Sequence, residues 1–437
     1  MPEYNLNEGR SGSPEQSASQ KRAGNLSRLT LLLAVVCLIQ LGLLAMLVFG
    51  RRPESGVHFQ PPVTVMPAIA TPQEPYLHGH PGPWGDLEYA RISLEPPDEF
   101  VPADANFFGA THWFFEGYTP ATLAAFFGQC GLPPAQLAEL TNAAAWSEKT
   151  DGVLVLPGDD LVLALDEPAR QKIYSVLAKS QENTLHLWPF KSRSDNLENW
   201  FGDAGLSDGT LALLKKLVYR RGECLCFSDI SVVYPRIARD DERRRLIKRL
   251  ARTRTLLMKL HVTPNSNVDA LADYWAKGRR NKDIVALLDS LTNTPGGMTI
   301  DVAHLLPAFA RKYLYTFPTP PADLASTKWP DCNWTAFNFF RDQPDDRFYD
   351  FDVCGNDLVQ NYTKVREATF GDLIVFYRPD GFPIHVVVYI ADDIVFTKNG
   401  SSTFHPWTLM KWDDLISDYT LDYTPVYVIF HPKWPME

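Results

Sequence analysis

The chain has 437 residues, of which 45% are hydrophobic and 22% charged, proportions typical of a folded globular protein. Six cysteines are too few for a small disulfide-stapled scaffold. A formal net charge of -10 argues against sequence-independent binding of nucleic acid by the whole surface.

An uncharged apolar segment runs from Leu29 to Gly50. About 20 apolar residues in a helix span the hydrocarbon core of a bilayer, so this segment predicts one transmembrane helix with lipid as its partner. A cleavable signal peptide, the alternative, usually has a shorter apolar run that ends in small residues, whereas Arg51 and Arg52 follow here. Four basic residues precede the segment, which places the N-terminal tail inside the cell and the rest of the chain outside.

Two polar segments flank this predicted helix. Residues 1–28 are rich in Ser, Gly and Asn and are predicted to be a disordered cytoplasmic tail. Residues 53–102 contain many prolines and are predicted to form a partly extended stalk.

Residues 103–317 are predicted to form a mostly helical domain, because apolar residues recur there with the period of an amphipathic helix. Thr119, Asp166 and Ser207 stand where helix N-caps are expected. A short β-hairpin is expected over residues 153–165, with strands on both sides of a Pro-Gly-Asp-Asp turn.

Ten Lys and Arg residues lie between positions 236 and 259. We interpret them as the solvated face of one long helix rather than as a patch for an acidic polymer or for lipid headgroups. The interleaved aromatic residues that favour nucleic-acid binding are missing, so no nucleic acid is predicted as a partner.

Cys224 and Cys226 are separated by a single residue, and no second pair of ligands follows them. Zinc sites normally use wider spacings and two such pairs. We therefore expect both thiols to pack as small hydrophobic groups, and no metal or other cofactor is predicted.

The apolar period changes from that of helices to that of strands after residue 318. Pro330 and Asp331 predict a helix start, which places Cys332 in the first helical turn. Free N–H groups and the helix dipole favour an anion there, so the thiol is expected to have a lowered pKa and to be a better nucleophile. The same N–H groups could bind an oxyanion formed when the thiolate attacks a carbonyl.

Two predicted antiparallel strands follow, at residues 371–377 and 385–390, and His385 begins the second of them. A thiol and an imidazole are the minimum for nucleophilic acyl transfer. The sequence therefore predicts Cys332 as the nucleophile and His385 as the base.

Three motifs, in this order and spacing, resemble the NlpC/P60 superfamily of papain-like cysteine peptidases and amidases. They are Asp331-Cys332, Gly371-Asp372-Leu373-Ile374-Val375-Phe376 and His385-Val386-Val387-Val388-Tyr389-Ile390. The resemblance implies a circularly permuted papain-like α+β domain that hydrolyses peptide or amide bonds, commonly in bacterial cell-wall peptides. Together with the predicted membrane helix, it implies a single-pass protein of the bacterial cytoplasmic membrane, with its C-terminal domains in the periplasm or outside the cell.

The third catalytic residue of this superfamily orients the histidine from the following strand. An even-length loop would place Lys398 on the face of His385, whereas an odd-length loop would place Thr397 and Asn399 there. Lysine cannot accept a proton from imidazole. We therefore name Asn399 as the third residue and keep Lys398 as the alternative. If Lys398 occupied this position, catalytic activity would not be expected.

The sequence also departs from the superfamily pattern. Asn333 and Trp334 follow the cysteine where most members have Ser-Gly, and no glycine pair follows the upstream tyrosines Tyr313 and Tyr315. Two other interpretations of the cysteine remain open. It could form a disulfide with Cys354, or it could be a buried residue in an inactive copy of the fold.

The predicted fold class is α+β, with an N-terminal transmembrane helix, a mostly helical middle domain and a C-terminal papain-like helix with an antiparallel sheet. The predicted function is that of a membrane-anchored thiol hydrolase, and the alternative is a non-catalytic envelope scaffold whose helical domain binds an unknown protein partner. The predicted segments are the tail (1–28), the transmembrane helix (29–50), the stalk (53–102), the helical domain (103–317) and the NlpC/P60-like domain (318–437).

Overall fold

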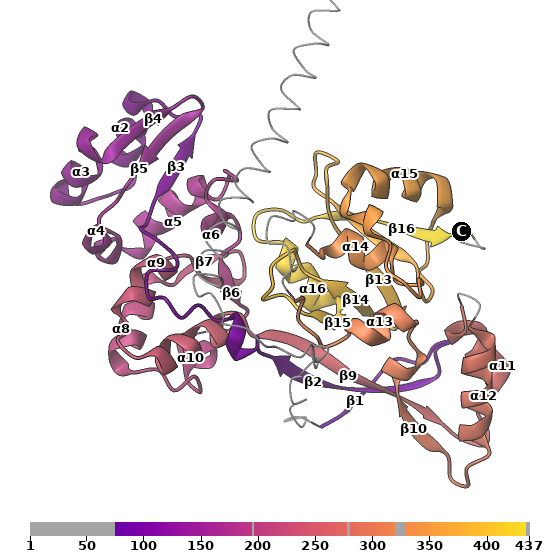
Figure 1. Ribbon diagram of the computed structural model, residues 1–437. Helices are drawn as coiled ribbons and strands as arrows, with labels where there is room; N and C mark the ends of the chain where they lie inside the picture. Colours follow the sequence, from indigo (N-terminus) through magenta and orange to yellow (C-terminus); the bar gives the residue numbers. More distant parts are fainter. Residues whose placement is uncertain (1–74, 195, 278–279, 320–328, 434–437) are drawn as a thin grey trace, which may run out of the picture. The chain divides into compact units, whose positions relative to one another are not determined.

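The computed structural model describes residues 75–194, 196–277, 280–319 and 329–433 (Figure 1). Apart from Thr319 and Trp329, these residues belong to one compact unit. The predicted cytoplasmic tail, the helix predicted at 29–50 and the first part of the predicted stalk lie outside the described residues.

The structure contradicts the predicted fold class. Among the helices of the described residues, none is long and apolar enough to cross a membrane. The middle of the chain also contains strands of three antiparallel sheets, so it is not the mostly helical domain that the apolar pattern predicted. The structure is α+β, and 39% of the described residues lie in helices and 24% in strands.

A four-stranded antiparallel sheet, in the order β1-β2-β9-β10, joins strands at residues 77–94 to strands at residues 253–301. Its central strands are paired from Asp86↔His261 to Leu94↔Thr253, so part of the predicted stalk is a strand. The prediction of one long helix over 236–259 is also wrong, because the helix ends at Leu250 and a buried strand follows. The strands are β1 (Leu77–His78), β2 (Asp86–Leu94), β9 (Thr253–Val262) and β10 (Met298–Asp301).

Most of the basic residues of 236–259 form ion pairs with carboxylates of the same chain. Seven of their guanidinium groups form ion pairs with carboxylates of the described residues. The pairs are Arg236–Asp159, Arg239–Asp241, Arg243–Asp240, Arg244–Asp98, Arg245–Asp241, Arg249–Asp203 and Arg252–Glu95.

The segment from Trp113 to Leu250 has its own hydrophobic core, in which helices pack around two three-stranded antiparallel sheets. We call this segment the middle core. The sheets are β3-β5-β4 (Trp113–Glu116, Gly152–Val155, Trp146–Lys149) and β6-β8-β7 (Phe190–Ser192, Cys224–Phe227, Tyr219–Arg221). The helices are α2 (Pro120–Gly128), α3 (Pro134–Leu140), α4 (Asp159–Ala164), α5 (Glu167–Leu177), α6 (Thr184–Leu187), α7 (Leu197–Phe201), α8 (Asp208–Leu217), α9 (Ile230–Val233) and α10 (Asp240–Leu250).

The three predicted N-caps of the middle core are confirmed. The side chains of Thr119, Asp166 and Ser207 each accept a hydrogen bond from the backbone N–H three residues later. The predicted hairpin is half wrong, because β5 is a strand but residues 161–165 lie in and just after α4. Asp159 and Asp160 stand in the first turn of that helix, where negative charge is favourable.

The C-terminal part is built on a six-stranded antiparallel sheet in the order β11-β16-β12-β13-β14-β15. Its strands are β11 (Tyr362–Val365), β12 (Leu373–Tyr377), β13 (Pro383–Ala391), β14 (Ile394–Lys398), β15 (Trp407–Lys411) and β16 (Val426–Pro432). The remaining helices are α11 (Val268–Trp275), α12 (Asn281–Thr292), α13 (Ala308–Tyr313), α14 (Cys332–Phe337), α15 (Phe351–Asn361) and α16 (Trp412–Tyr419). Short 3-10 helices lie at Asp98–Phe100 (η1), Ala143–Ala145 (η2), Tyr234–Arg236 (η3), Val302–Leu305 (η4) and Asp346–Tyr349 (η5).

The two faces of this sheet are covered by different helices. Val386 and Val388 of β13 share a core with Phe337 of α14. Val387, which alternates with them, packs with Leu415 of α16. Because side chains of a strand alternate between faces, His385 lies on the same α16 face as Val387.

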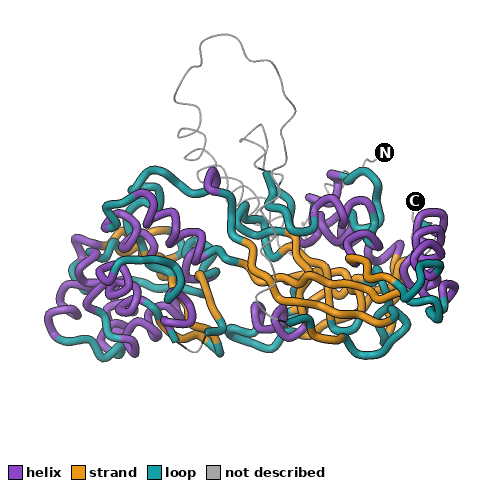
Figure 2. The backbone as a smooth tube through the Cα atoms, turned by 90° about the horizontal axis from the view of Figure 1, so that it is seen from below, coloured by secondary structure: helices purple, strands orange, loops and turns teal. Residues whose placement is uncertain are grey.

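The six-stranded and four-stranded sheets contact one another directly. Thr255 Oγ1 of β9 donates to Leu409 O of β15 at 3.0 Å and accepts from Leu409 N at 3.1 Å. Figure 2 shows the strands of these two sheets running beside each other. One hydrophobic core accordingly contains residues from Leu87 to Phe430, so the predicted boundary at residue 317 does not coincide with a boundary between cores.

Candidate active site

Cys332 is the first residue of α14, as the sequence predicts. Its helix is capped by Asp331, whose carboxylate accepts from Trp334 N at 2.8 Å. The thiol is partly buried and is not in a disulfide. The backbone N–H groups of Val386 and Asn333 interact with the sulfur and favour the thiolate. The sulfur therefore lies beside the backbone of β13, one residue after His385.

The predicted lowering of the Cys332 pKa is wrong. Burial, followed by the nearby carboxylate of Asp331, raises the pKa of this thiol to about 12. The N–H groups of Val386 and Asn333 and the charge of Lys398 act in the opposite direction but are weaker. Helix α14 has only 6 residues, so its dipole is small.

The proposed disulfide alternative is also wrong. Cys332 and Cys354 are both free. The thiol of Cys354 is buried and donates to Phe348 O at 3.3 Å. Cys332 therefore keeps a thiol that is available for chemistry.

His385 lies on β13, 4% exposed, on the face covered by α16. Its Nε2 atom is 3.0 Å from Thr397 Oγ1. Its ring stacks on Tyr419 of α16, with centroids 4.5 Å apart and an interplanar angle of 21°. Burial lowers the pKa of His385 to about 3, so the ring is neutral at physiological pH.

Strands β13 and β14 place Asn399, the residue after the end of β14, on the side of His385. Asn399 Oδ1 accepts from Thr397 Oγ1 at 3.0 Å, and Asn399 Nδ2 donates to Asp418 Oδ2 at 3.1 Å. Asn399 thus reaches the imidazole through the hydroxyl of Thr397. This is the arrangement that an odd-length loop was expected to produce.

Lys398 lies on the opposite face of β14, fully buried. Its ammonium group donates to Gly400 O at 2.6 Å and to Ser402 O at 3.1 Å. Burial lowers its pKa to about 7, opposed by electrostatic interaction with Asp331 and Cys332. Lys398 is therefore placed near the cysteine and does not orient the histidine.

The relation between Cys332 and His385 is indirect in the described part of the chain. No hydrogen bond joins the sulfur to the imidazole there. The imidazole contacts Thr397 through Nε2 and forms a further hydrogen bond with the side chain of Asn399, which favours the protonated ring. The ring of Tyr419, which stacks on His385, also interacts electrostatically with Cys332. The structure thus brings the two predicted residues to the same end of β13, one on each side of the strand.

Thr397, Tyr419 and Asp418 were not predicted as site residues. Thr397 follows from the same strand parity that selects Asn399, because the two residues share a face. Tyr419 and Asp418 belong to α16, and nothing in their local sequence indicates contact with β13 or β14.

The Gly371-Asp372 part of the second motif has a structural explanation. Gly371 has φ +89, and a Cβ atom there would lie 2.2 Å from the ring of Phe340. Asp372 is fully buried and accepts from Thr369 N at 2.9 Å, with His431 Nδ1 at 2.7 Å from its other oxygen. This pair ties the start of β12 to β16 and lies apart from His385.

Cys224 and Cys226 are buried side by side in β8 and are not bonded to each other. Within the described ranges, no group of three potential metal ligands is found. Both side chains belong to the hydrophobic core of the middle core, which supports their interpretation as packed side chains.

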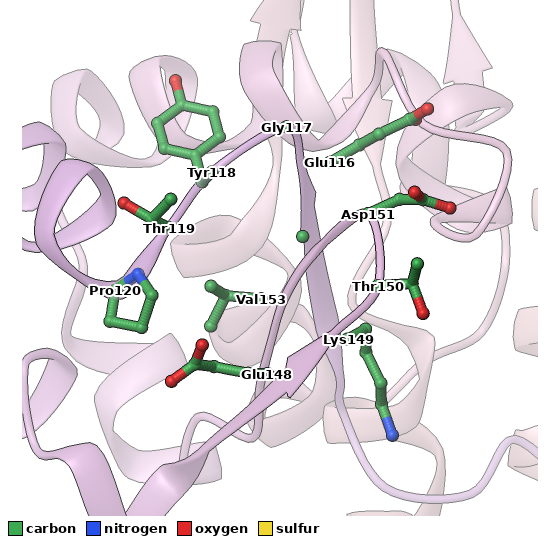
Figure 3. Close-up of a pocket in the computed structure, with 11 residues that line it drawn as sticks. Glu116, Gly117, Tyr118, Thr119, Pro120, Glu148, Lys149, Thr150, Asp151 and Val153 are labelled. Carbon is green, nitrogen blue, oxygen red and sulfur yellow. The ribbon is translucent and has the colours of Figure 1, made fainter.

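A separate hollow of about 560 Å³ lies in the middle core, between the β3–β5 sheet and the start of α2 (Figure 3). It is lined by exposed charged residues, among them Glu116, Glu148, Lys149 and Asp151. Figure 3 shows Glu116 and Asp151 pointing to one side, Glu148 to the other and Lys149 downward, so the four side chains do not converge. The hollow therefore offers no constellation for catalysis.

The comparisons with known proteins found no relative. No family model, no curated protein and no solved structure matches the chain.

Proposed function

We propose that this protein is a thiol hydrolase that cleaves a peptide or amide bond, with Cys332 as nucleophile and His385 as base. The observation that carries the proposal is the position of the Cys332 sulfur against the Val386 N–H, one residue along β13 from His385, whose Nε2 contacts Thr397. This engagement leaves Nδ1 to act as the base.

The chemistry starts from a neutral thiol and a neutral imidazole. His385 takes the thiol proton as the sulfur attacks the carbonyl carbon, and the imidazolium then protonates the leaving amine. The C–N bond breaks while a thioester forms on Cys332, and water hydrolyses that thioester. No cofactor is required for these steps.

The resemblance to NlpC/P60 proteins extends the proposal to peptides, including those of bacterial cell walls. The C-terminal part contains most of the excess of acidic residues in the chain. A strongly anionic polymer would be repelled by such a surface, so a peptide is the better substrate class.

A second candidate is a non-catalytic scaffold in which this fold has lost its chemistry. One observation favours it: burial raises the pKa of Cys332 to about 12 and lowers that of His385 to about 3, so no thiolate–imidazolium pair exists in this structure. Active thiol enzymes usually stabilise the thiolate.

Alkylation by iodoacetamide at pH 6 separates the two candidates. The hydrolase proposal predicts that Cys332 of the full chain reacts faster than the thiol of free glutathione, and that His385→Gln slows this reaction by about 100-fold or more, the size of a general-base contribution. Peptide mapping by mass spectrometry identifies the labelled cysteine. Cys130, Cys224, Cys226 and Cys354 are buried and are expected to react slowly.

The control is His78→Gln, because His78 is an exposed residue of β1, in the four-stranded sheet. Its alkylation rate should equal that of the wild type. A Cys332 that reacts no faster than glutathione, or equally fast without His385, contradicts the hydrolase proposal and supports the scaffold.

A further inference from the structure

A continuous chain of polar contacts runs from the imidazole of His385 to a lysine of the middle core. After Thr397 and Asn399, it continues through Asp418, whose Oδ1 lies 3.3 Å from Lys191 Nζ. Lys191 also donates to the backbone oxygen of Asp418 at 2.7 Å. Both charged side chains are largely shielded, with 24% and 28% exposure.

The direction of each hydrogen bond in this chain follows from its last member. An ionised carboxylate only accepts, so Asn399 must turn its amide nitrogen toward Asp418. The amide nitrogen also faces Met410 Sδ at 3.4 Å, a second acceptor. Asn399 Oδ1 is then left for Thr397, whose hydroxyl donates to it.

The direction of these hydrogen bonds also determines which nitrogen of His385 has the proton. A hydroxyl has one proton, and Thr397 uses it toward Asn399, so its lone pair must face His385 Nε2. Nε2 therefore has the proton, and Nδ1 has the free lone pair. Because burial keeps the ring neutral, one tautomer is selected rather than an imidazolium.

We propose that Asp418 is a positioning residue that fixes His385 in the Nε2–H tautomer, and that Lys191 of the middle core holds Asp418 in place. The inference deepens the proposed function. It rests on that function only in assuming that Nδ1 of His385 acts as the base. It makes the proton acceptor of the site depend on two elements outside the three motifs: helix α16 and strand β6.

Nitrogen-15 NMR of the full chain labelled with 15N-histidine tests the inference at pH 7. In the wild type, His385 is expected to show a protonated, pyrrole-type Nε2 and an unprotonated, pyridine-type Nδ1, assigned by their different couplings to the ring protons. Asp418→Asn can donate as well as accept, so Asn399 can turn over, and the two His385 signals should move toward an average of both tautomers. Thr397→Val, which removes the hydroxyl, should have the same effect.

Asp414→Asn is the matched control. Asp414 lies on the same helix and also pairs with the middle core, through Arg193 at 3.0 Å, but it does not contact Asn399. This variant should leave the His385 signals unchanged. Lys191→Met should shift them in the same direction as Asp418→Asn, and it serves as the second test if that variant does not fold.

An Nδ1–H tautomer in the wild type would overturn the inference, as would wild-type signals in both Asp418→Asn and Thr397→Val. These outcomes are independent of the alkylation test. If His385 has the Nε2–H tautomer but Cys332 is unreactive, only the hydrolase proposal is contradicted. If Cys332 is reactive but His385 shows both tautomers, only the role of Asp418 is contradicted.

Discussion

Replacing Asp229 by alanine is expected to lower the free energy of unfolding by about 3–5 kcal/mol, because it leaves a buried cation without its partner. Arg170 and Asp229 are 0% and 1% exposed, with Arg170 Nη1 at 3.1 Å from Asp229 Oδ2. The other carboxylate oxygen accepts from Tyr174 Oη at 2.6 Å, so a second buried donor also loses its acceptor. Urea unfolding followed by circular dichroism measures the loss.

The control for this experiment is Asp159→Ala, which removes the carboxylate of another Arg–Asp pair in the same core. Asp159 pairs with Arg236 at 2.6 Å, but the side chains are 39% and 32% exposed. Water can solvate the remaining arginine there, so the expected loss is at most about 1 kcal/mol. Equal losses in both variants would show that burial does not determine how much the Arg170–Asp229 pair contributes to the free energy of unfolding.

The helix starts could be predicted because their causes lie within three residues. Thr119, Asp166, Ser207 and Asp331 each satisfy an N–H group in the first turn of their own helix, and that geometry is local. Cys332 was correctly placed at a helix start for the same reason.

The strand pairing of β2 with β9 could not be predicted from the pattern. It joins residues 86–94 to residues 253–262, and the first of these ranges lies among prolines that indicate a stalk. A short apolar run such as 256–262 fits a buried helix and a buried strand equally well. Only the partner strand decides between them.

The site was predicted as far as strand alternation reaches. Alternation restricts the residues beside His385 to Thr397 and Asn399, or to Lys398, and the structure has the first pair there. The contributions of α16 depend on its packing against β13 and β14, which no local pattern encodes. The pKa of Cys332 was predicted in the wrong direction. The sequence shows that the residue starts a helix, but it does not show that the thiol is buried, and burial has the larger effect on the pKa.

Acid is expected to destabilise the protein through His186, another buried imidazole. His186 is 6% exposed and packs edge-on against Tyr174, with ring centroids 4.6 Å apart. Its Nε2 atom is buried and has no hydrogen-bond partner among the described residues. Burial, aided by the charges of His112, Arg221 and Arg170, lowers its pKa to about 3.

The sign of the effect follows from proton uptake. The unfolded chain binds a proton at this histidine below about pH 6.5, whereas the folded protein does not until about pH 3, so stability is complete above pH 6.5 and is lost as the pH falls. Between pH 7 and pH 5 this one group should lower the free energy of unfolding by about 2 kcal/mol. In His186→Phe, the drop measured by urea unfolding at the two pH values should shrink by that amount. A poorly fitting phenylalanine would lower stability equally at both pH values, so an unchanged difference between them would show that His186 does not cause the acid sensitivity.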